Sequence, residues 1–213
     1  MLFQLKNLLR NAASAAAVAV LCATAMPAAM ASPIYDNLGS SRDGSDPIFG
    51  FGPLANSFTT GVDGAGFLGS VTALLKNGST SIVGDIHVGL HANSGNAPGA
   101  ELVSLGDLSS ADVATADFAE YAFAPLTSFL LAANTTYWIE IIALDPNAIE
   151  WSWSNDLSAT GVAGQSNYSA ALGTNANSSF GPYQMAVSQV PEPESLALVF
   201  LGLGVMVMVK RRS

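Results

Sequence analysis

The two histidines of the chain are the first residues whose type and spacing could do chemistry. His87 and His91 stand four residues apart in the run SIVGDIHVGLHA, and Asp85 precedes His87 by two. On a helix both imidazoles could bind one zinc ion, but on a strand their Cα atoms stand about 13 Å apart, at roughly 3.3 Å per residue. Asp85 and His87 could share an ion, yet this run supplies no third ligand. We therefore interpret these residues as the solvated face of a strand, without a bound metal.

A second candidate is the loop SRDGSDP, which places Asp43 and Asp46 around Gly44. Carboxylate oxygens in a tight loop suit calcium. The EF-hand spacing of alternating acidic ligands with a distal glutamate is absent, and an Asp/Ser/Gly loop is first of all a turn. Calcium at Asp43 and Asp46 therefore stays open as the one cofactor to consider, and no other cofactor is expected.

Trp151 and Trp153 flank Ser152 in EWSWSND, so on a strand both indoles point the same way, about 6.6 Å apart. Two exposed rings at this spacing could bind a sugar by stacking. The alternative is that both rings fill a hydrophobic core, where a domain with three tryptophans usually places them. We favour the core and keep a carbohydrate-binding role for Trp151 and Trp153 as the alternative.

Enzyme motifs are missing from the sequence. It has no G-x-S-x-G elbow, no H-E-x-x-H and no phosphate-binding glycine loop. A glycosidase needs two carboxylates at a set separation, but in so acidic a chain a pair such as Glu140 and Glu150 is no evidence. We expect no enzymatic activity, and a secreted hydrolase is the weakest alternative.

The elements that must position these residues are short strands. Alternating apolar runs are separated by Gly, Pro, Asn and Asp, and no long stretch has a helical period. The pattern predicts an all-β fold, a two-sheet β-sandwich of jelly-roll type. Strands are predicted at residues 66–76, 81–92, 117–124, 136–144, 148–154 and 182–189, whereas residues 32–56 and 158–181 are weakly patterned.

The alternation also predicts which side chains face the core. In residues 81–92, Ile82, Ile86, Val88 and Leu90 share one face, and the histidines share the other. In residues 136–144, Tyr137, Ile139 and Ile141 alternate with Trp138, Glu140 and Ile142. The following Asp145-Pro146-Asn147 predicts a hairpin-like turn into the next strand.

The N-terminus has the features of a secretory signal peptide. Lys6 and Arg10 are followed by an apolar run, and Ala29 and Ala31 occupy the positions that signal peptidase reads. We expect residues 1–31 to be removed by that enzyme. The one cysteine, Cys22, lies in this segment, so the domain at residues 32–189 contains no disulfide.

The charge of the domain excludes some partners. Between residues 32 and 189 the chain has two basic residues, Arg42 and Lys76, and fourteen acidic residues, a formal charge of −12. Such a surface repels phosphate backbones, so we expect no nucleic-acid partner.

Residues 190–213 form a tail in three parts. A helix-breaking Pro191-Glu192-Pro193 is followed by an uncharged run at residues 195–209 and then by Lys210, Arg211 and Arg212. As a helix, the 15 residues of the run would be about 22 Å long, short of the roughly 30 Å of membrane hydrocarbon. We expect a transmembrane helix that resides in the inner membrane transiently, with the basic residues on the cytoplasmic side.

The tail, VPEPESLALVFLGLGVMVMVKRRS, resembles the PEP-CTERM sorting signal of Gram-negative bacteria. The resemblance implies that an exosortase, a membrane transpeptidase, recognises Pro191, Glu192 and Pro193 and cuts nearby. It also implies an exported protein that passes through an inner-membrane intermediate to the cell surface or extracellular matrix. Proteins with this signal are commonly associated with exopolysaccharide and biofilm.

The central domain is similar to the choice-of-anchor domains, most nearly the R type. The similarity lies in YDNLG at residues 35–39, HVGLHANSGNAPGAELVSLG at 87–106, LAANTTYWIEI at 131–141 and EWSWSND at 150–156. It implies a β-sandwich with no established catalytic residues. We expect a non-enzymatic surface or matrix protein whose partner is extracellular polysaccharide, with a carbohydrate-binding module as the main alternative.

Overall fold

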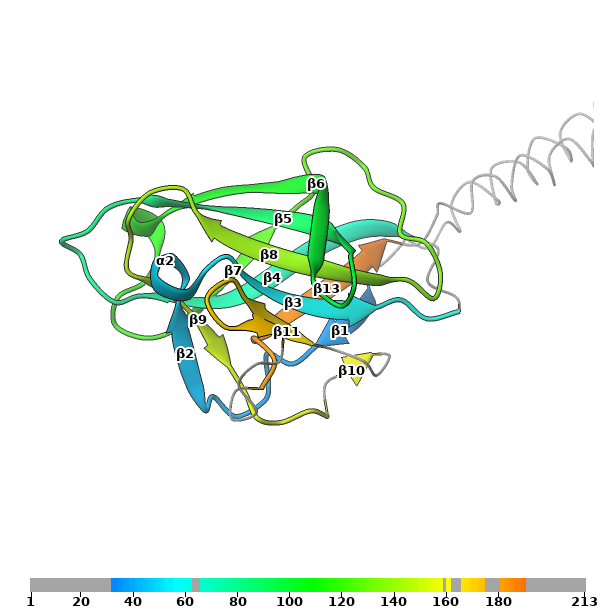
Figure 1. Ribbon diagram of the computed structural model, residues 1–213, viewed down its shortest axis with the longest axis horizontal. Coiled ribbons are helices and arrows are strands. Elements are labelled where there is room, and N and C mark those ends of the chain that lie inside the picture. The colour runs from blue at the N-terminus through cyan, green and yellow to red at the C-terminus, as the bar shows by residue number, and fades with distance from the viewer. Residues whose placement is uncertain (1–31, 63–65, 159, 162–165, 175–180, 191–213) are drawn as a thin grey trace, which may run out of the picture. The chain divides into compact units, whose positions relative to one another are not determined.

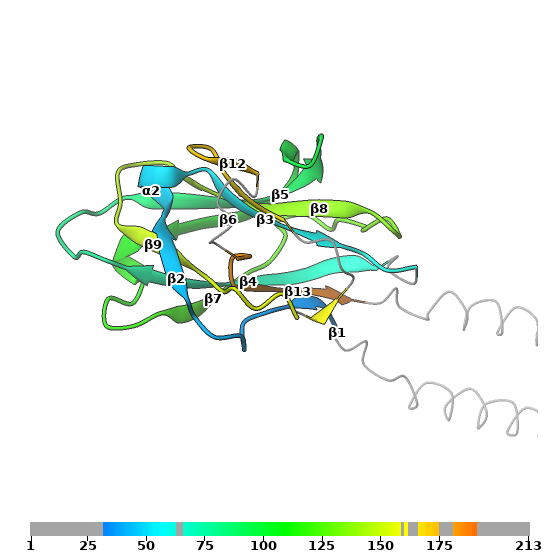
Figure 2. The same ribbon diagram turned by 60° about the horizontal axis from the view of Figure 1, so that its bottom comes forward.

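The protein is an all-β sandwich of two antiparallel sheets (Figures 1 and 2). The computed structural model describes residues 32–62, 66–158, 160–161, 166–174 and 181–190. The predicted fold class is confirmed within these residues. The predicted signal peptide and hydrophobic C-terminal helix lie outside them.

The strands begin at Ser32 and end at Val190, with two short helices between them. In chain order the elements are β1 (Ser32–Asp36), β2 (Gly44–Pro47), α2 (Ile48–Phe51), β3 (Leu54–Thr59), β4 (Phe67–Asn77), β5 (Asp85–Asn93), β6 (Pro98–Ser109), the 3-10 helix η1 (Ser110–Asp112), β7 (Ala119–Phe123), β8 (Thr136–Ala143), β9 (Ile149–Trp153), β10 (Thr160–Gly161), β11 (Asn167–Ser169), β12 (Gly173–Thr174) and β13 (Met185–Val190).

The strand order is that of a jelly roll. In the described residues, one sheet runs β10-β1-β13-β4-β9-β2, with β7 also paired to β4, and the other runs β12-β11-β3-β8-β5-β6. The eight principal strands in chain order are β1, β3, β4, β5, β6, β7, β8 and β13. One sheet contains strands one, eight, three and six of this series, which are β1, β13, β4 and β7. The other contains strands two, seven, four and five, which are β3, β8, β5 and β6. Two interlocked Greek keys of this kind define the jelly roll.

The core lies between the inner faces of the two sheets. Val71, Ala73 and Leu75 of β4 are fully buried on one side, and Ile139 and Ile141 of β8 on the other. Successive strand residues alternate between faces, so each strand contributes every second side chain to the core. The predicted inward faces of β5 and β8 are confirmed, since Ile86, Val88, Leu90 and Tyr137 belong to the same cluster.

Three details of the prediction are wrong. Ile82, predicted on the core face, is exposed, because β5 begins only at Asp85 and the preceding residues form a link outside the sheet. The turn at Asp145-Pro146-Asn147 is not a hairpin, because β8 and β9 belong to different sheets. Residues 32–56, which carry no clear strand pattern, contain β1, β2 and the start of β3.

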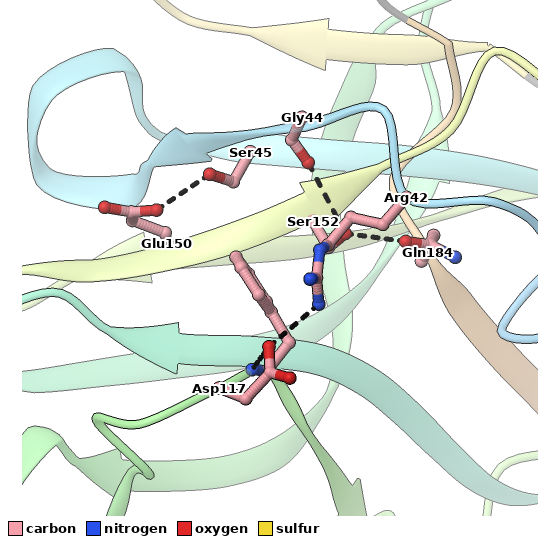
Figure 3. Close-up of polar contacts among 8 residues, drawn as sticks. Arg42, Gly44, Ser45, Asp117, Glu150, Ser152 and Gln184 are labelled. Carbon is pink, nitrogen blue, oxygen red and sulfur yellow. Dashed lines mark hydrogen bonds and ion pairs between the residues drawn. The ribbon is translucent and has the colours of Figure 1, made fainter.

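The last strand, β13, is fixed in place by buried polar side chains that we call the amide network: the amides of Asn37, Asn56 and Gln184 and the hydroxyl of Ser152. Gln184 Nε2 donates to the carbonyl of Ser40 over 2.9 Å, and its Oε1 accepts from Ser152 Oγ over 2.6 Å (Figure 3). Asn37 Oδ1 accepts from the backbone N–H of Met185 over 2.7 Å. Asn56, on the opposite sheet, accepts from the N–H of Tyr183 over 3.1 Å. Buried polar groups must be paired, so this network sets where β13 enters the sheet.

Candidate functional site

The two histidines lie on the outward face of β5, on the side of the six-stranded sheet away from the core. This face is formed by the alternate residues His87, Gly89 and His91, whose neighbours Ile86, Val88 and Leu90 point inward. Strand β5 pairs with β6 on one side and with β8 on the other. Together these strands bring Glu101, Asp107 and Glu140 to the histidines, and we call the five ionisable side chains the histidine row.

His87 contacts a carboxylate on each side of its ring. Its Nδ1 lies 2.6 Å from Asp107 Oδ1, and its Nε2 lies 3.2 Å from Glu101 Oε1. An ionised carboxylate only accepts hydrogen bonds, so His87 donates to both carboxylates only as an imidazolium, with a proton on each ring nitrogen. Partial burial would lower the pKa of His87, but hydrogen bonds to Asp107 and Glu101 and their charges raise it above its usual 6.5.

His91 is almost buried and has a different pair of partners. Its Nδ1 lies 2.9 Å from the carbonyl oxygen of Gly99, which can only accept, so Nδ1 carries a proton. Its Nε2 lies 3.6 Å from Glu140 Oε1. Half-burial of Glu140 raises the pKa of that carboxyl, and the nearby His91 opposes the rise. Glu140 is therefore held close to a potential cation instead of being free in water.

Gly89 leaves room for the side chains of Glu101 and His91 to approach each other. A Cβ atom at this position would lie 3.0 Å from His91 Nε2 and 3.2 Å from Glu101 Cδ. The carboxylate of Glu101 therefore extends across Gly89, between the two imidazoles. A side chain at residue 89 would push Glu101 away from His87.

The side chains of the histidine row can bind protons, but they do not point toward one common position that a metal ion could occupy. Nδ1 and Nε2 point away from each other on the imidazole, so Asp107 and Glu101 lie on opposite sides of His87. Within residues 32–190, where the structure describes them, no group of three or more His, Cys, Asp or Glu side chains is arranged to hold a metal ion. What the arrangement can do is link the edge strand β6 to β5 in a pH-dependent way.

The partners Glu101 and Asp107 were not identified from the sequence. The sequence feature that could have identified them is the turn-rich NSGNAPG, which joins β5 and β6 in a hairpin. In this hairpin His91 lies opposite Glu101 and His87 opposite Asp107. The register shifts at three places along this pair of strands, so counting residues outward from the turn does not give the correct partners. The predicted Asp85 lies at the end of β5, two residues before His87, opposite Ser109.

Asp43 and Asp46, the calcium candidates, have separate partners. Asp43 is exposed, and its Oδ2 accepts from the N–H of Asn155 over 2.6 Å. Asp46 is half-buried, and its Oδ2 accepts from the Tyr183 hydroxyl over 2.8 Å. Burial raises the pKa of Asp46, an effect that this hydrogen bond from Tyr183 opposes. The two carboxylates do not form a joint site.

Trp151 and Trp153 are buried in the core, as favoured above. Trp151 stacks on Tyr183 with ring centroids 4.7 Å apart, and its Nε1 donates to the carbonyl of Gln184 over 2.9 Å. The indole of Trp153 packs against Gly44, where a Cβ would collide with the ring. Neither ring presents an open face to a sugar, so the stacking platform proposed for these two residues is incorrect.

The two basic residues of the domain meet on one aromatic ring. Arg42 Cζ lies 4.7 Å and Lys76 Nζ 6.0 Å from the ring centroid of Phe118, within cation–π range. Arg42 also pairs with Asp117 over 3.0 Å, and Glu150 accepts from Ser45 over 2.7 Å on the same outer surface (Figure 3). Both cations are thus paired or stacked next to carboxylates, which leaves no concentrated positive surface for an anionic ligand.

The start and the end of the sandwich lie side by side. β1 and β13 are antiparallel neighbours in which Ser32 pairs with Gln189 (Figure 2). The predicted processing residues Ala29, Ala31, Pro191, Glu192, Pro193, Lys210, Arg211 and Arg212 lie outside the described residues. Both segments that carry them are nevertheless joined to neighbouring positions of one sheet.

No helix among the described residues is long and apolar enough to cross a membrane, and the predicted span at residues 195–209 falls outside them. In comparisons with known proteins, no family model matches the chain and no curated protein matches it.

Proposed function

We propose that the chain is an exported, non-enzymatic surface or extracellular-matrix protein, whose β-sandwich is attached through its C-terminal segment and sorted by an exosortase. The tail that follows the sandwich would hold the protein in the inner membrane until it is cut near Pro191-Glu192-Pro193. The polymer with which the released domain associates would be extracellular polysaccharide.

One observation supports this proposal above the others. β13 ends at Val190, the first residue of the predicted signal and the neighbour of Pro191, and β13 is paired on both sides, with β1 and β4. The first described residue, Ser32, directly follows the predicted signal-peptidase site and pairs with Gln189. Each predicted cleavage site therefore adjoins the folded sheet, so removal of both segments leaves every strand of the sandwich intact.

The test is processing in a Gram-negative host with and without an exosortase. In the host with the enzyme, we expect the intact mass of the surface form to correspond to a chain that begins at Ser32 and lacks residues 195–213. In the host without it, the tail should remain and the protein should stay in the inner membrane.

A matched variant separates recognition from folding. Replacing Pro191, Glu192 and Pro193 together by alanine changes no residue of the described strands, so we expect unchanged thermal unfolding and a retained tail. A surface form that keeps residues 195–213 in the exosortase host would contradict the proposal. So would removal of the tail from the triple-alanine variant at the normal rate.

A further inference from the structure

The end of the sandwich at which the chain enters and leaves differs from the rest of the surface. We call it the tether end and define it by residues 32–33, 60–62, 66–68, 130–135 and 189–190. Val190 pairs with Phe67, and Phe67 forms a bridge with Leu130. The N–H of Asn134 donates to the carbonyl of Gly61 over 3.2 Å, so the link after β3 belongs to the same end.

The tether end carries no charge among its described residues. Among the described residues, the charged side chains next along the sequence include Asp36, Asp46, Lys76, Glu120 and Glu140, all on strands away from this end. Asp63 and Glu192 lie outside the described residues. The domain as a whole has a formal charge of −12, so the described residues of the tether end differ in charge from the rest of the domain. Ala132, Ala133 and Asn134 are exposed there instead.

Two aliphatic side chains project from this uncharged surface. Val62 is 75% exposed and Leu130 is 50% exposed. Exposure alone does not distinguish the tether end, since Val83, on the link before β5, is 67% exposed. Val83 differs in its surroundings, because its link leads directly into Asp85 and contacts the loop that contains Asp145.

The length of chain outside the structure places a membrane close to this end. Four residues separate Val190 from the apolar run that begins at Ser195. Even fully extended, the five steps from Val190 to Ser195 span at most about 18 Å. The headgroup layer alone takes up about 5–8 Å of that distance. While the tail is in the membrane, the tether end cannot leave the bilayer surface.

We infer that the tether end is a membrane-docking surface, on which Val62 and Leu130 enter the headgroup layer of a lipid bilayer. This inference rests on the proposed attachment through the tail. Charge favours the same orientation, because anionic headgroups repel the acidic remainder of the domain and leave the uncharged end facing the lipid. Aliphatic side chains at the interface then remove apolar surface from water.

Site-specific fluorescence tests the docking. The chain is expressed through its own leader in a host without an exosortase, with Cys22→Ala, and is reconstituted in vesicles of phosphatidylethanolamine and phosphatidylglycerol. A single cysteine at Val62→Cys or Leu130→Cys carries the dye, and Val83→Cys is the control of similar exposure. With nitroxide-labelled headgroups, we expect the first two dyes to be quenched and the third to stay bright.

A second variant makes the result specific. Adding Val62→Asp to the Leu130→Cys chain should abolish quenching while the chain still floats with the vesicles and melts at the same temperature, because residue 62 is exposed. Flotation without quenching of the original reporters, or equal quenching at Val83→Cys, would overturn the docking and leave the tail attachment standing. Failure to float would overturn the attachment and the docking together. A further outcome is contact between dyes at Val62→Cys that increases with the amount of protein per vesicle, without quenching by the lipid. This would show an interface between copies of the chain and overturn the inference.

Discussion

The amide network and the histidine row solve the same problem, the pairing of polar side chains on a β-sandwich, in opposite ways. Gln184 and Asn56 are fully buried, neutral and bonded to backbone groups of three strands or their flanks. His87 and Glu101 are partly exposed, ionisable and bonded to each other across an edge pair of strands. The first network holds the strand that leads to the tail, and the second holds the edge strand β6.

The two networks differ in how they respond to pH and salt. Neutral amides do not titrate, and buried interactions are screened much less by salt than exposed ones, so we expect the position of β13 to depend little on pH and ionic strength. Ion pairs at a surface contribute little and depend on both. The interactions that do not titrate thus lie beside β13, the strand that leads to residues 191–213.

The largest expected effect is at the aromatic side chain that packs against the amide network. Trp151→Ala should lower the free energy of unfolding by about 3–5 kcal/mol, because it leaves a cavity beside Tyr183. Trp151→Phe, which retains an aromatic ring, should cost clearly less. Urea denaturation of both variants checks this. Unchanged unfolding of Trp151→Ala with lost retention on polysaccharide would instead restore the stacking role.

Removal of the central amide comes next. Gln184→Ala leaves the Ser152 hydroxyl and several buried carbonyl groups without their partner, which should cost about 1–3 kcal/mol. The loss should be the same below and above the titration of His87, since no ionisable group bonds to this side chain. A pH-dependent loss in urea denaturation would contradict the separation of the two networks.

The histidine row should show a smaller, pH-dependent effect. The folded pKa of His87 is raised above its usual 6.5, so its stabilisation is fully present below about pH 6.5 and is lost as pH rises through the folded value. Exposed ion pairs contribute at most about 1 kcal/mol, which corresponds to about 2–4 °C in melting temperature. His87→Gln should flatten this part of the pH profile. If the slope persists in that variant, another group carries it.

The smallest effect is expected at Arg42. Its ion pair with Asp117 is exposed on both sides, and exposed pairs of this kind are often without measurable effect. Arg42→Ala should leave the melting temperature nearly unchanged at all pH values, which makes it the control for charge removal in the experiments on His87. A decrease in melting temperature as large as that of Gln184→Ala would mean that the stacking of Arg42 on Phe118 contributes substantially to stability.

The strands that the sequence identifies are those with a clear alternation. Residues 136–144 and 148–154 were predicted as strands because apolar side chains recur at every second position, and β8 and β9 occupy them. β3 was missed because Asn56 and Ser57 interrupt its apolar pattern. Their burial is explained only by partners far along the chain: Tyr35 and Tyr183 for Asn56, and Ser166 for Ser57.

The candidate site was predictable in part for the same reason. Alternation along β5 put His87 and His91 on the outward face, which is where they lie. Their carboxylate partners depend on the pairing register, and β5 and β6 change register between Val88 and Gly89 and again beyond Leu90. Local patterning contains no information about such shifts. The prediction of a solvated face also failed for His91, which neighbouring strands almost bury.

The pairing of β1 with β13 has a consequence for folding kinetics. The bond from Met185 N–H to Asn37 Oδ1 joins positions 148 residues apart, among the least local contacts in the domain. Contacts of this kind form late and slow the folding of β-sheet proteins. Since β13 fills the space between β1 and β4, a chain that stops short of Met185 cannot close this sheet. Completion of the sandwich therefore coincides with delivery of the final strand, and a truncated product would remain open and exposed to proteases.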